Sequence, residues 1–331
     1  MFPGRPSASD MRSFAAEILR RSSQRLAPHP EELTSAVEPE AARPPVVAVP
    51  AKKPHGPADT TESRDGGSDT LVSPKAVQVA YQPIFNLNSG MTVGVEALGL
   101  WAEDAIDALS PLTTHVGVAG QEILATAIAQ GSTWRQHREY APAVITANLS
   151  TLDLLDPDLV PMISVALATH GLDPRRLCIE VNESALMEDI AATAAVMGRL
   201  KDLGLLLAID DFGTGHSSLS HLRKLPVDIL KVDRSFVQSI YNREDRVIAK
   251  AVIDLAHTLG MTTIAEGVET RLQVEVLHAL NCDMAQGPYL QCPVSADALD
   301  FGQIDFDAPS PIENSDLRFA PSTAMSSFVR R

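Results

Sequence analysis

The sequence predicts an α/β protein folded as a TIM-like (β/α)8 barrel, and two observations carry this prediction. Short apolar segments recur along the middle of the chain, and segments with helical spacing lie between many of them. Strands that alternate with helices are typical of a parallel sheet covered by helices. Seven or eight such units within about 225 residues fit a closed barrel better than an open sheet. The doubly wound alternative is disfavoured because no G-x-G-x-x-G sequence follows an early strand.

The predicted strands are short apolar segments, most of which contain or end on a polar side chain. They cover residues 76–85, 92–98, 143–150, 177–184, 205–211, 228–233, 262–269 and 284–290. In a barrel of this kind the functional site lies at the C-terminal ends of the strands. Polar residues that are scattered along the sequence are therefore expected to converge on one mouth of the barrel.

Two predicted helices, residues 191–204 and 245–260, illustrate the segments between the strands. Each has apolar residues at helical spacing and ends on a glycine, Gly204 in the first and Gly260 in the second. Glycine is the residue that most often follows a helix, because it adopts the left-handed conformation without strain.

Both ends of the chain differ in composition from the barrel domain, which we assign to residues 73–300. Residues 1–72 are predicted to be a mostly disordered extension, because 27–72 is dense in Pro, Ala, Glu, Ser and Gly. A short amphipathic helix is predicted near residues 9–26, either as a frayed surface helix or as a docking helix for a protein partner. Residues 301–331 are polar and contain proline, so we expect a flexible C-terminal tail.

The composition excludes several classes of protein. The chain of 331 residues has 27 Lys and Arg against 42 Asp and Glu, and its net charge of −15 is unsuited to binding a nucleic-acid polymer. No apolar stretch reaches the ~18–20 residues of a membrane span, and the N-terminus lacks the apolar core of a signal peptide. The three cysteines are scattered, which is typical of reduced thiols in a cytoplasmic protein.

The polar residues near the strand ends form an acidic, all-oxygen set with one cation. Its members are Glu96, Asn148, Glu180, Asp210, Asp211, Lys231 and Glu266. Carboxylates gathered at one mouth repel each other, so either protons or hard divalent cations must neutralise them. Carboxylate and amide oxygens without Cys or His favour Mg²⁺ or Mn²⁺ over Zn²⁺.

Lys231 and Asp233 lie two residues apart on a strand, so both are expected to face the barrel interior. An ammonium among carboxylates can orient a nucleophilic water, and Glu266 can accept the proton of that water. The alternative for Lys231 is a simple salt bridge to Asp233. These residues favour metal-assisted hydrolysis, most plausibly of a phosphate ester, and enolase-type proton abstraction is the competing chemistry.

The motifs resemble those of the EAL-domain family, the bacterial cyclic di-GMP phosphodiesterases, from about Tyr81 to Val294. The motifs that carry the resemblance are "YQPIF", "EAL" at 96–98, "NLS" at 148–150, "EVNE" at 180–183, "DDFGTGHSSL", "LPVDILKVDRSF", "AEGVET" and "QGPYL". The resemblance implies an EAL-type barrel that hydrolyses cyclic di-GMP to the linear dinucleotide pGpG with Mg²⁺ or Mn²⁺.

The resemblance also implies a role for individual residues. Metal ligands are implied at Glu96, Asn148, Glu180 and Asp210, and Asp211 serves a second metal. Catalytic roles are implied for Lys231, which holds the attacking water, for Glu266 as the base, and for Glu183, which braces the loop that begins at Asp211. The substrate site is expected to be lined by Gln82, Leu98, Asp233, Glu269 and Gln286.

The sequence departs from the family pattern in three places. Leu100 stands where the family usually has a basic residue that contacts a substrate phosphate, Asn182 replaces a common threonine, and residues 107–121 replace a family helix motif. Two readings follow: an active phosphodiesterase with an altered grip on its substrate, or a cyclic di-GMP receptor or protein-interaction module without turnover. Family members often dimerise, so a homodimer is a further expectation, as is a role in the choice between motility and biofilm.

Overall fold

The computed structural model describes residues 78–100, 118–137, 144–183, 189–213, 222–304 and 306. The predicted extension 1–72, with its helix near residues 9–26, lies outside the described residues, and so does the chain after residue 306. Within the described part, no helix combines the length and the apolar character needed to cross a membrane.

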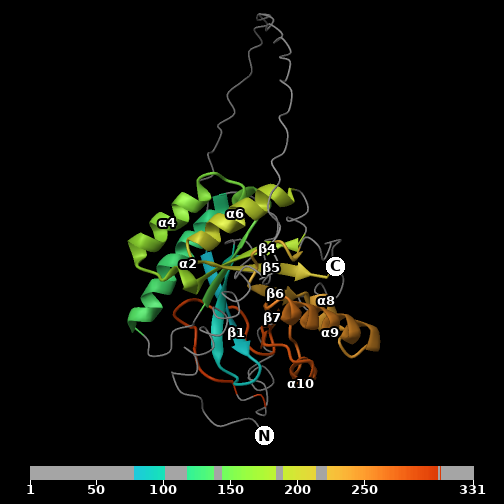
Figure 1. The fold of residues 1–331 in the computed structure, drawn as a ribbon. Coiled ribbons are helices and arrows are strands. Elements are labelled where there is room, and N and C mark those ends of the chain that lie inside the picture. The colour runs from blue at the N-terminus through green and yellow to red at the C-terminus, as the bar shows by residue number, and fades with distance from the viewer. Residues whose placement is uncertain are drawn as a thin grey trace, which may run out of the picture. The chain divides into compact units, whose positions relative to one another are not determined.

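Eight strands close into one barrel, and their order around the barrel follows the order of the chain. Figure 1 shows strands of this barrel with the helices beside them. The strands are β1 (Gln78–Asn86), β2 (Thr92–Leu100), β3 (Val144–Leu149), β4 (Leu177–Asn182), β5 (Leu206–Phe212), β6 (Ile229–Val232), β7 (Thr262–Ala265) and β8 (Met284–Ala285). The predicted TIM-like barrel is thereby confirmed.

One strand departs from the all-parallel arrangement that the alternating pattern suggests. β1 is antiparallel to both of its neighbours, β2 and β8, whereas the remaining neighbours run parallel. The reason lies in the short connection 87–91, because a parallel crossover needs a dozen or more residues. The side-chain oxygen of Asn86 accepts hydrogen bonds from the backbone N–H groups of Asn88 and Ser89, which fixes this turn.

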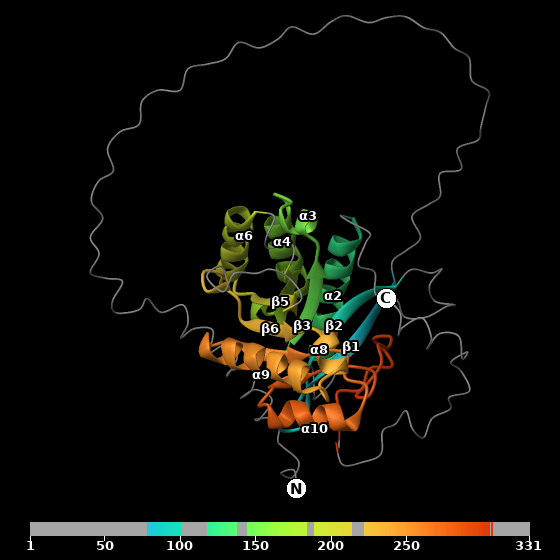
Figure 2. The same cartoon turned by 90° about the vertical axis from the view of Figure 1, so that its right-hand side faces the viewer.

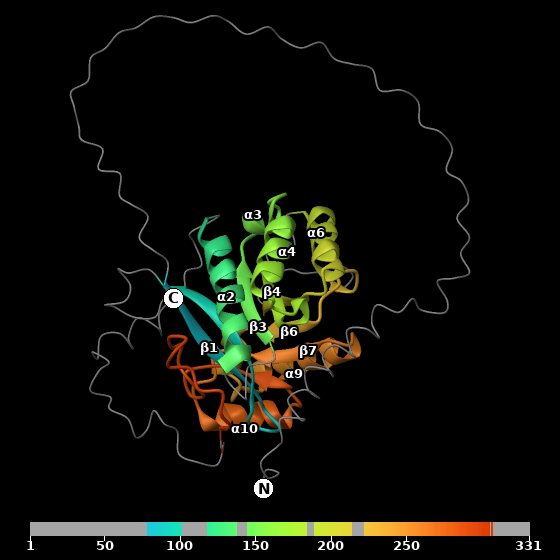
Figure 3. The ribbon, with the colours of Figure 1, turned by 90° about the vertical axis from the view of Figure 1, so that its left-hand side faces the viewer.

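Helices cover the outside of the barrel (Figures 2 and 3). The described helices are α2 (Val118–His137), α3 (Thr151–Leu154), α4 (Leu159–His170), the 3₁₀ helix η2 (Pro174–Arg176), α6 (Ile190–Asp202), α8 (Arg234–Gln238), α9 (Arg243–Thr258) and α10 (Arg271–Ala279). Helix α2 packs on β2 and β3, α6 packs on β5, and α9 packs on β6 and β7. The glycines predicted to end α6 and α9 follow these helices with positive φ, 94° at Gly204 and 74° at Gly260.

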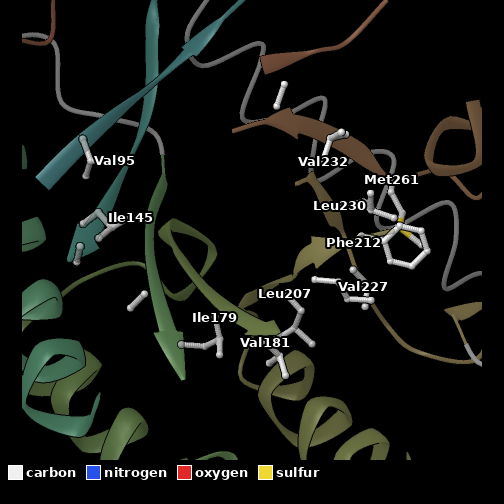
Figure 4. Packing of buried hydrophobic residues seen from close by; sticks show 14 of the residues in the cluster. Val95, Ile145, Ile179, Val181, Leu207, Phe212, Val227, Leu230, Val232 and Met261 are labelled. Atoms are coloured by element: carbon white, nitrogen blue, oxygen red, sulfur yellow. The ribbon is translucent and has the colours of Figure 1, made fainter. Parts of the chain in front are cut away.

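Two apolar layers hold the barrel and its helices together. The larger layer lies between the strands and the helices, and Figure 4 shows part of it, including Ile145, Val181 and Leu207. The smaller layer is formed by Ile84, Val93, Val144, Cys178, Leu206, Ala208, Ile229, Ile264 and Met284. Since side chains alternate along a strand, this smaller set faces the barrel interior and plugs it.

The interior plug positions the site, because the next inward-facing residue on each strand lies two positions further along. Glu180 follows Cys178 in this way, and Asp210 follows Ala208. Lys231, Glu266 and Gln286 stand in the same relation to Ile229, Ile264 and Met284. The apolar plug is therefore the floor on which the polar groups lie.

The C-terminal part of the described chain packs against the barrel beyond the predicted domain end at residue 300. Phe301 and Phe306 are buried, and the ring of Phe301 meets that of Trp134 edge-on at 5.4 Å between centroids. Gln303 forms a β-bridge with Met91, which holds this segment beside the β1–β2 turn.

A buried ion pair ties α6 to the strands. The Nζ of Lys201 lies 2.9 and 2.8 Å from the two carboxylate oxygens of Asp228, which is 3% exposed at its side chain. The backbone N–H of Leu207 also donates to Asp228, at 2.8 Å. A buried charge that loses its partner is costly, so the removal of one member of this pair is expected to destabilise the protein strongly.

Replacing Asp228 tests this expectation. Asp228→Ala is expected to lower the free energy of unfolding by about 3–5 kcal/mol, because it leaves the ammonium of Lys201 without its carboxylate. Urea denaturation followed by circular dichroism measures the change. The matched control is Asp254→Ala, whose partner Lys250 is exposed, with an expected loss below about 1 kcal/mol. Equal losses in the two variants would contradict the account.

Candidate metal-binding active site

Lys231 lies at the centre of the polar cluster at the mouth of the barrel. Its side chain is fully buried, and its Nζ lies 2.6 Å from Glu180, 2.7 Å from Glu266 and 3.1 Å from Asp210. A fourth carboxylate, that of Glu96, lies 3.6 Å away. The charges that meet at this point come from four strands, β2, β4, β5 and β6, and from the residue that follows β7. The arrangement brings together residues that are separated by up to 170 positions in the sequence, since 266 − 96 = 170.

Two amides complete this cluster on the side of β2. The Nδ2 of Asn148 donates to Glu96 Oε1 at 2.6 Å, and the Nε2 of Gln286 donates to Glu96 Oε2 at 2.5 Å. Gln286 also donates to Glu266 Oε1 at 3.1 Å. Gln286 therefore links the carboxylates of two distant strands, and it holds Glu266 beside Lys231.

A second acidic group lies next to the first, at the end of β5. Asp211 has a φ of 55°, the left-handed region, and its backbone N–H donates to Asp210 Oδ1 at 3.0 Å. Asn182 donates from Nδ2 to Asp211 Oδ2 at 2.6 Å. Asp233 accepts from the backbone N–H of Ser235 at 2.8 Å, as the N-cap of α8. Lys231 makes its described ion pairs with carboxylates other than Asp233, so the simple pair considered from the sequence is not the one formed.

The remaining predicted residues lie around this centre with other partners. Glu183 is buried and accepts the backbone N–H of Gly213 at 2.9 Å, just after β5. Glu269 accepts from Gln238 at 2.9 Å, and Gln82 donates to the backbone carbonyl of Gln291 at 3.1 Å. Leu98 lies two residues beyond Glu96 on β2 and so on the same face of the strand.

Sequence reasoning gave no role to Asn182, although the structure places it in direct contact with Asp211. The signal was present, because Asn182 lies two residues after Glu180 on the same strand. That spacing predicts a common face, but it does not name the partner on the neighbouring strand.

Burial and mutual repulsion change the acidity of the cluster. Burial, followed by the charge of Glu96, raises the pKa of Glu180 to about 8. Burial and Asp210 likewise raise the pKa of Glu266 well above its usual range. Burial lowers the pKa of Lys231, but the carboxylates of Asp210, Glu180 and Glu266 outweigh it and hold that pKa well above its ordinary value. The cluster therefore retains protons when no metal is bound.

Asp211 is affected in the same direction. Burial raises its pKa to about 6, and Asp210 and a hydrogen bond with Asp233 add to the effect. Carboxylates this close together cannot all be ionised without a cation between them.

The donor set fits a hard divalent cation. One oxygen each from Asp210, Asp211 and Glu266 lies within 4.8 Å of the others. Within the described part of the chain, Glu180 Oε1 is buried without a hydrogen-bond partner, and so is Gln286 Oε1. Carboxylate and amide oxygens are the ligands that Mg²⁺ and Mn²⁺ prefer. The residues present therefore suit a cation of this class.

Comparison with known proteins identifies the family. The model of the EAL domain matches residues 68–293, more than half of the chain. This chain therefore belongs to the EAL domain family, whose members are generally cyclic di-GMP phosphodiesterases that depend on divalent metals.

Individual relatives are similar to this chain over about two thirds of its length. An uncharacterized protein of Azorhizobium caulinodans is 40% identical over 224 residues, which cover 64% of this chain and 30% of the relative. The bifunctional diguanylate cyclase/cyclic di-GMP phosphodiesterase MucR of Pseudomonas aeruginosa is 36% identical over 230 residues, which cover 66% of this chain and 33% of MucR. The matched region thus spans about a third of these curated relatives.

Solved structures of isolated domains match along most of their length. The MucR phosphodiesterase in complex with c-di-GMP is 33% identical with a TM-score of 0.59, and the match covers 67% of this chain and 93% of that one. The EAL domain of Mycobacterium smegmatis DcpA is 34% identical with a TM-score of 0.59, and the match covers 68% and 95%.

The raised pKa of Glu180 predicts how stability depends on pH in the absence of metal. The folded state holds a proton that the unfolded chain releases near pH 4.5, so the free energy of unfolding should fall as the pH rises toward about 8. The slope is at most about 1.4 kcal/mol per pH unit for one proton. Urea denaturation in EDTA between pH 5 and 8 measures it.

Glu180→Gln is the control for this prediction, and it is expected to make the slope less steep because glutamine does not titrate, while Glu266 and Asp211 still contribute. With Mn²⁺ in place of EDTA the wild-type slope is expected to reverse, since ligands must be deprotonated to bind a metal. A metal-free stability that rises with pH over this range would refute the electrostatic account.

Proposed function

We propose that this chain hydrolyses cyclic di-GMP to pGpG with Mg²⁺ or Mn²⁺. The observation that carries the proposal is the set of acidic side chains around Lys231 in a chain of the EAL domain family. The names of MucR and of its c-di-GMP complex support the choice of substrate. A domain that had lost its activity would be expected to lose metal-binding side chains first, and this sequence retains Glu96, Asn148, Glu180, Asp210 and Asp211.

Two side chains carry the proposed proton and water chemistry. Lys231 holds the attacking water and stabilises the charge that develops on the phosphate. Glu266 accepts the proton of that water as the oxygen of the water bonds to phosphorus. The bond from phosphorus to the 3′ oxygen breaks, which leaves the 5′-phosphate of pGpG, and the released 3′ oxygen takes up a proton from Glu266 or from solvent water to become a hydroxyl group. A divalent cation held by Glu96, Asn148, Glu180 and Asp210 would supply Lewis-acid polarisation of the phosphate.

The surrounding side chains have proposed supporting roles. Gln286 keeps Glu266 and Glu96 in place through its two hydrogen bonds. Glu183 holds the backbone at Gly213, where the segment after β5 begins. Further out, the nucleotide is proposed to contact the side chains of Gln82, Leu98, Asp233 and Glu269.

The replacement at Leu100 is the observation that motivates a second candidate function. A phosphate that loses one charge-assisted hydrogen bond is held more weakly by about 1.5–3 kcal/mol, or about ten- to a hundredfold. The second candidate is therefore a cyclic di-GMP receptor or interaction module with little turnover. Binding of cyclic di-GMP in Ca²⁺, measured at equilibrium, together with no pGpG formed in Mn²⁺, would favour this candidate over the enzyme.

The proposed cellular role follows from the proposed reaction. Hydrolysis of cyclic di-GMP lowers a bacterial second messenger, which favours motility over biofilm in many bacteria, and it places the protein in the cytoplasm with its substrate. Dimer formation and a protein partner for the helix near residues 9–26 are parts of this proposal that size-exclusion chromatography with light scattering and pull-down experiments address.

A direct assay tests both the function and the role of Lys231. The purified full-length chain is incubated with cyclic di-GMP and Mn²⁺, and pGpG is measured by chromatography. Wild type is expected to form pGpG. Lys231→Ala is expected to form none, because the ammonium that holds the attacking water is missing, but it should still bind cyclic di-GMP. Lys250→Ala, at an exposed lysine, is the matched control and should keep full turnover. Unchanged turnover in Lys231→Ala would refute the assigned role.

Leu100→Arg tests whether a missing cation weakens the grip on the substrate. The added guanidinium is expected to lower the KM for cyclic di-GMP by about tenfold, because it supplies a charge-assisted hydrogen bond to a phosphate. Steady-state kinetics in Mn²⁺ measure the effect. Leu272→Arg adds the same charge at an exposed leucine of α10 and controls for general attraction of the anion. If both variants change the KM equally, the phosphate is held in another way.

A further inference from the structure

Asn182, at the end of β4, is a residue to which neither the family pattern nor the catalytic proposal gives a role. It is paired with Asp210 in the register of β4 and β5, and it lies two residues beyond Glu180 on the same face. Its side chain reaches past Asp210 to the next residue, where Nδ2 donates to Asp211 Oδ2 at 2.6 Å. This is a short, charge-assisted hydrogen bond between neighbouring strands.

Asp211 is held in a conformation that needs support. Its φ of 55° is rare for a residue other than glycine, and it directs the side chain away from the ordinary course of the strand. Its neighbours are acidic, because its backbone N–H rests on Asp210 Oδ1 at 3.0 Å and its carboxylate lies beside that of Asp233. Repulsion from these two carboxylates would turn the side chain of Asp211 outward unless a donor held it.

Asp233 also forms a side-chain hydrogen bond with Asp211, but a hydrogen bond between two carboxyl groups requires that one of them keep a proton. As the N-cap of α8, Asp233 accepts from the backbone N–H of Ser235 at 2.8 Å and from the hydroxyl of the same residue. The amide of Asn182, by contrast, is a neutral donor whose hydrogen bond to Asp211 Oδ2 needs no such proton. An oxygen of Asp211 lies within 4.8 Å of oxygens of Asp210 and Glu266, so Asp211 is close enough to share a cation with them.

We propose that Asn182 is a positioning residue that presents Asp211 to a second divalent cation. The inference rests on the proposed function for the existence of a two-metal site, and it deepens that function by naming what orients the second ligand. The amide of Asn182 contacts Asp211 directly, so its removal is expected to weaken binding of the second cation. Binding of the first cation is expected to remain, because it depends on Glu96, Asn148, Glu180 and Asp210.

Mn²⁺ binding to the full-length chain, measured by isothermal titration calorimetry without nucleotide, tests the inference. Wild type is expected to bind two ions, and Asp211→Asn identifies the step that belongs to the second. Asn182→Leu and Asn182→Ala, which lack the donor, are expected to weaken that step by about tenfold and to leave the other within about twofold. Asn182→Thr restores a donor and is expected to recover part of the loss.

The outcomes separate this inference from the proposed function. Unchanged binding of both ions in Asn182→Leu and Asn182→Ala, equal weakening of both, or a single ion in wild type would overturn the role of Asn182. Two ions in wild type with a selective loss in the variants, but no pGpG formed by any of them, would support the inference and refute the hydrolytic function. Because Asn182 is partly exposed at the end of its strand, the unfolding temperatures in EDTA are expected to agree among the variants.

Discussion

The site depends on the repulsion among carboxylates that the barrel gathers at its mouth, where Glu180 is fully buried and Asp210 and Glu266 are 15% exposed at their side chains. Lys231 is the buried cation that offsets this repulsion, through ion pairs of 2.6–3.1 Å with three carboxylates and a longer one with a fourth. One ammonium cannot balance so many acidic groups. The repulsion that remains, together with burial, raises the pKa values of Glu180 and Glu266. The carboxylates around Lys231 therefore favour the binding of divalent cations, and the same carboxylates position the proposed water and base.

The floor of apolar side chains makes this electrostatic arrangement effective. Cys178, Ile229 and Ile264 fill the barrel directly below the polar groups. Side chains alternate along a strand, so the residue two positions further along faces inward at the mouth of the barrel. A low-dielectric floor strengthens each charge interaction above it and keeps the carboxylates from being solvated individually. The buried pair of Lys201 and Asp228 is a second ionic tie, which joins α6 to β5 and β6.

The sequence was sufficient to predict the barrel, since apolar runs that end on polar residues mark strands such as 205–211, and Gly204 and Gly260 mark helix ends. It did not predict the direction of β1, although the turn "NLNSG" at 86–90 leaves too little chain for a parallel crossover. In the site, period-two spacing was the basis for expecting Lys231 and Asp233 on one face. The hydrogen-bond partners of these side chains could not be predicted. Gln286, for example, contacts Glu96, which is 190 positions away in the sequence, only because the barrel closes.

The central claim is that the acidic side chains around Lys231 hold divalent cations at the mouth of the barrel. The most direct measurement is a crystal structure of the protein grown with Mn²⁺, with an anomalous difference map collected near the manganese absorption edge. The account predicts strong anomalous peaks in coordination distance of Glu96, Asn148, Glu180 and Asp210, with Lys231 displaced from at least one of its carboxylates. A map without peaks among these residues, while Lys231 keeps all its ion pairs, would contradict it.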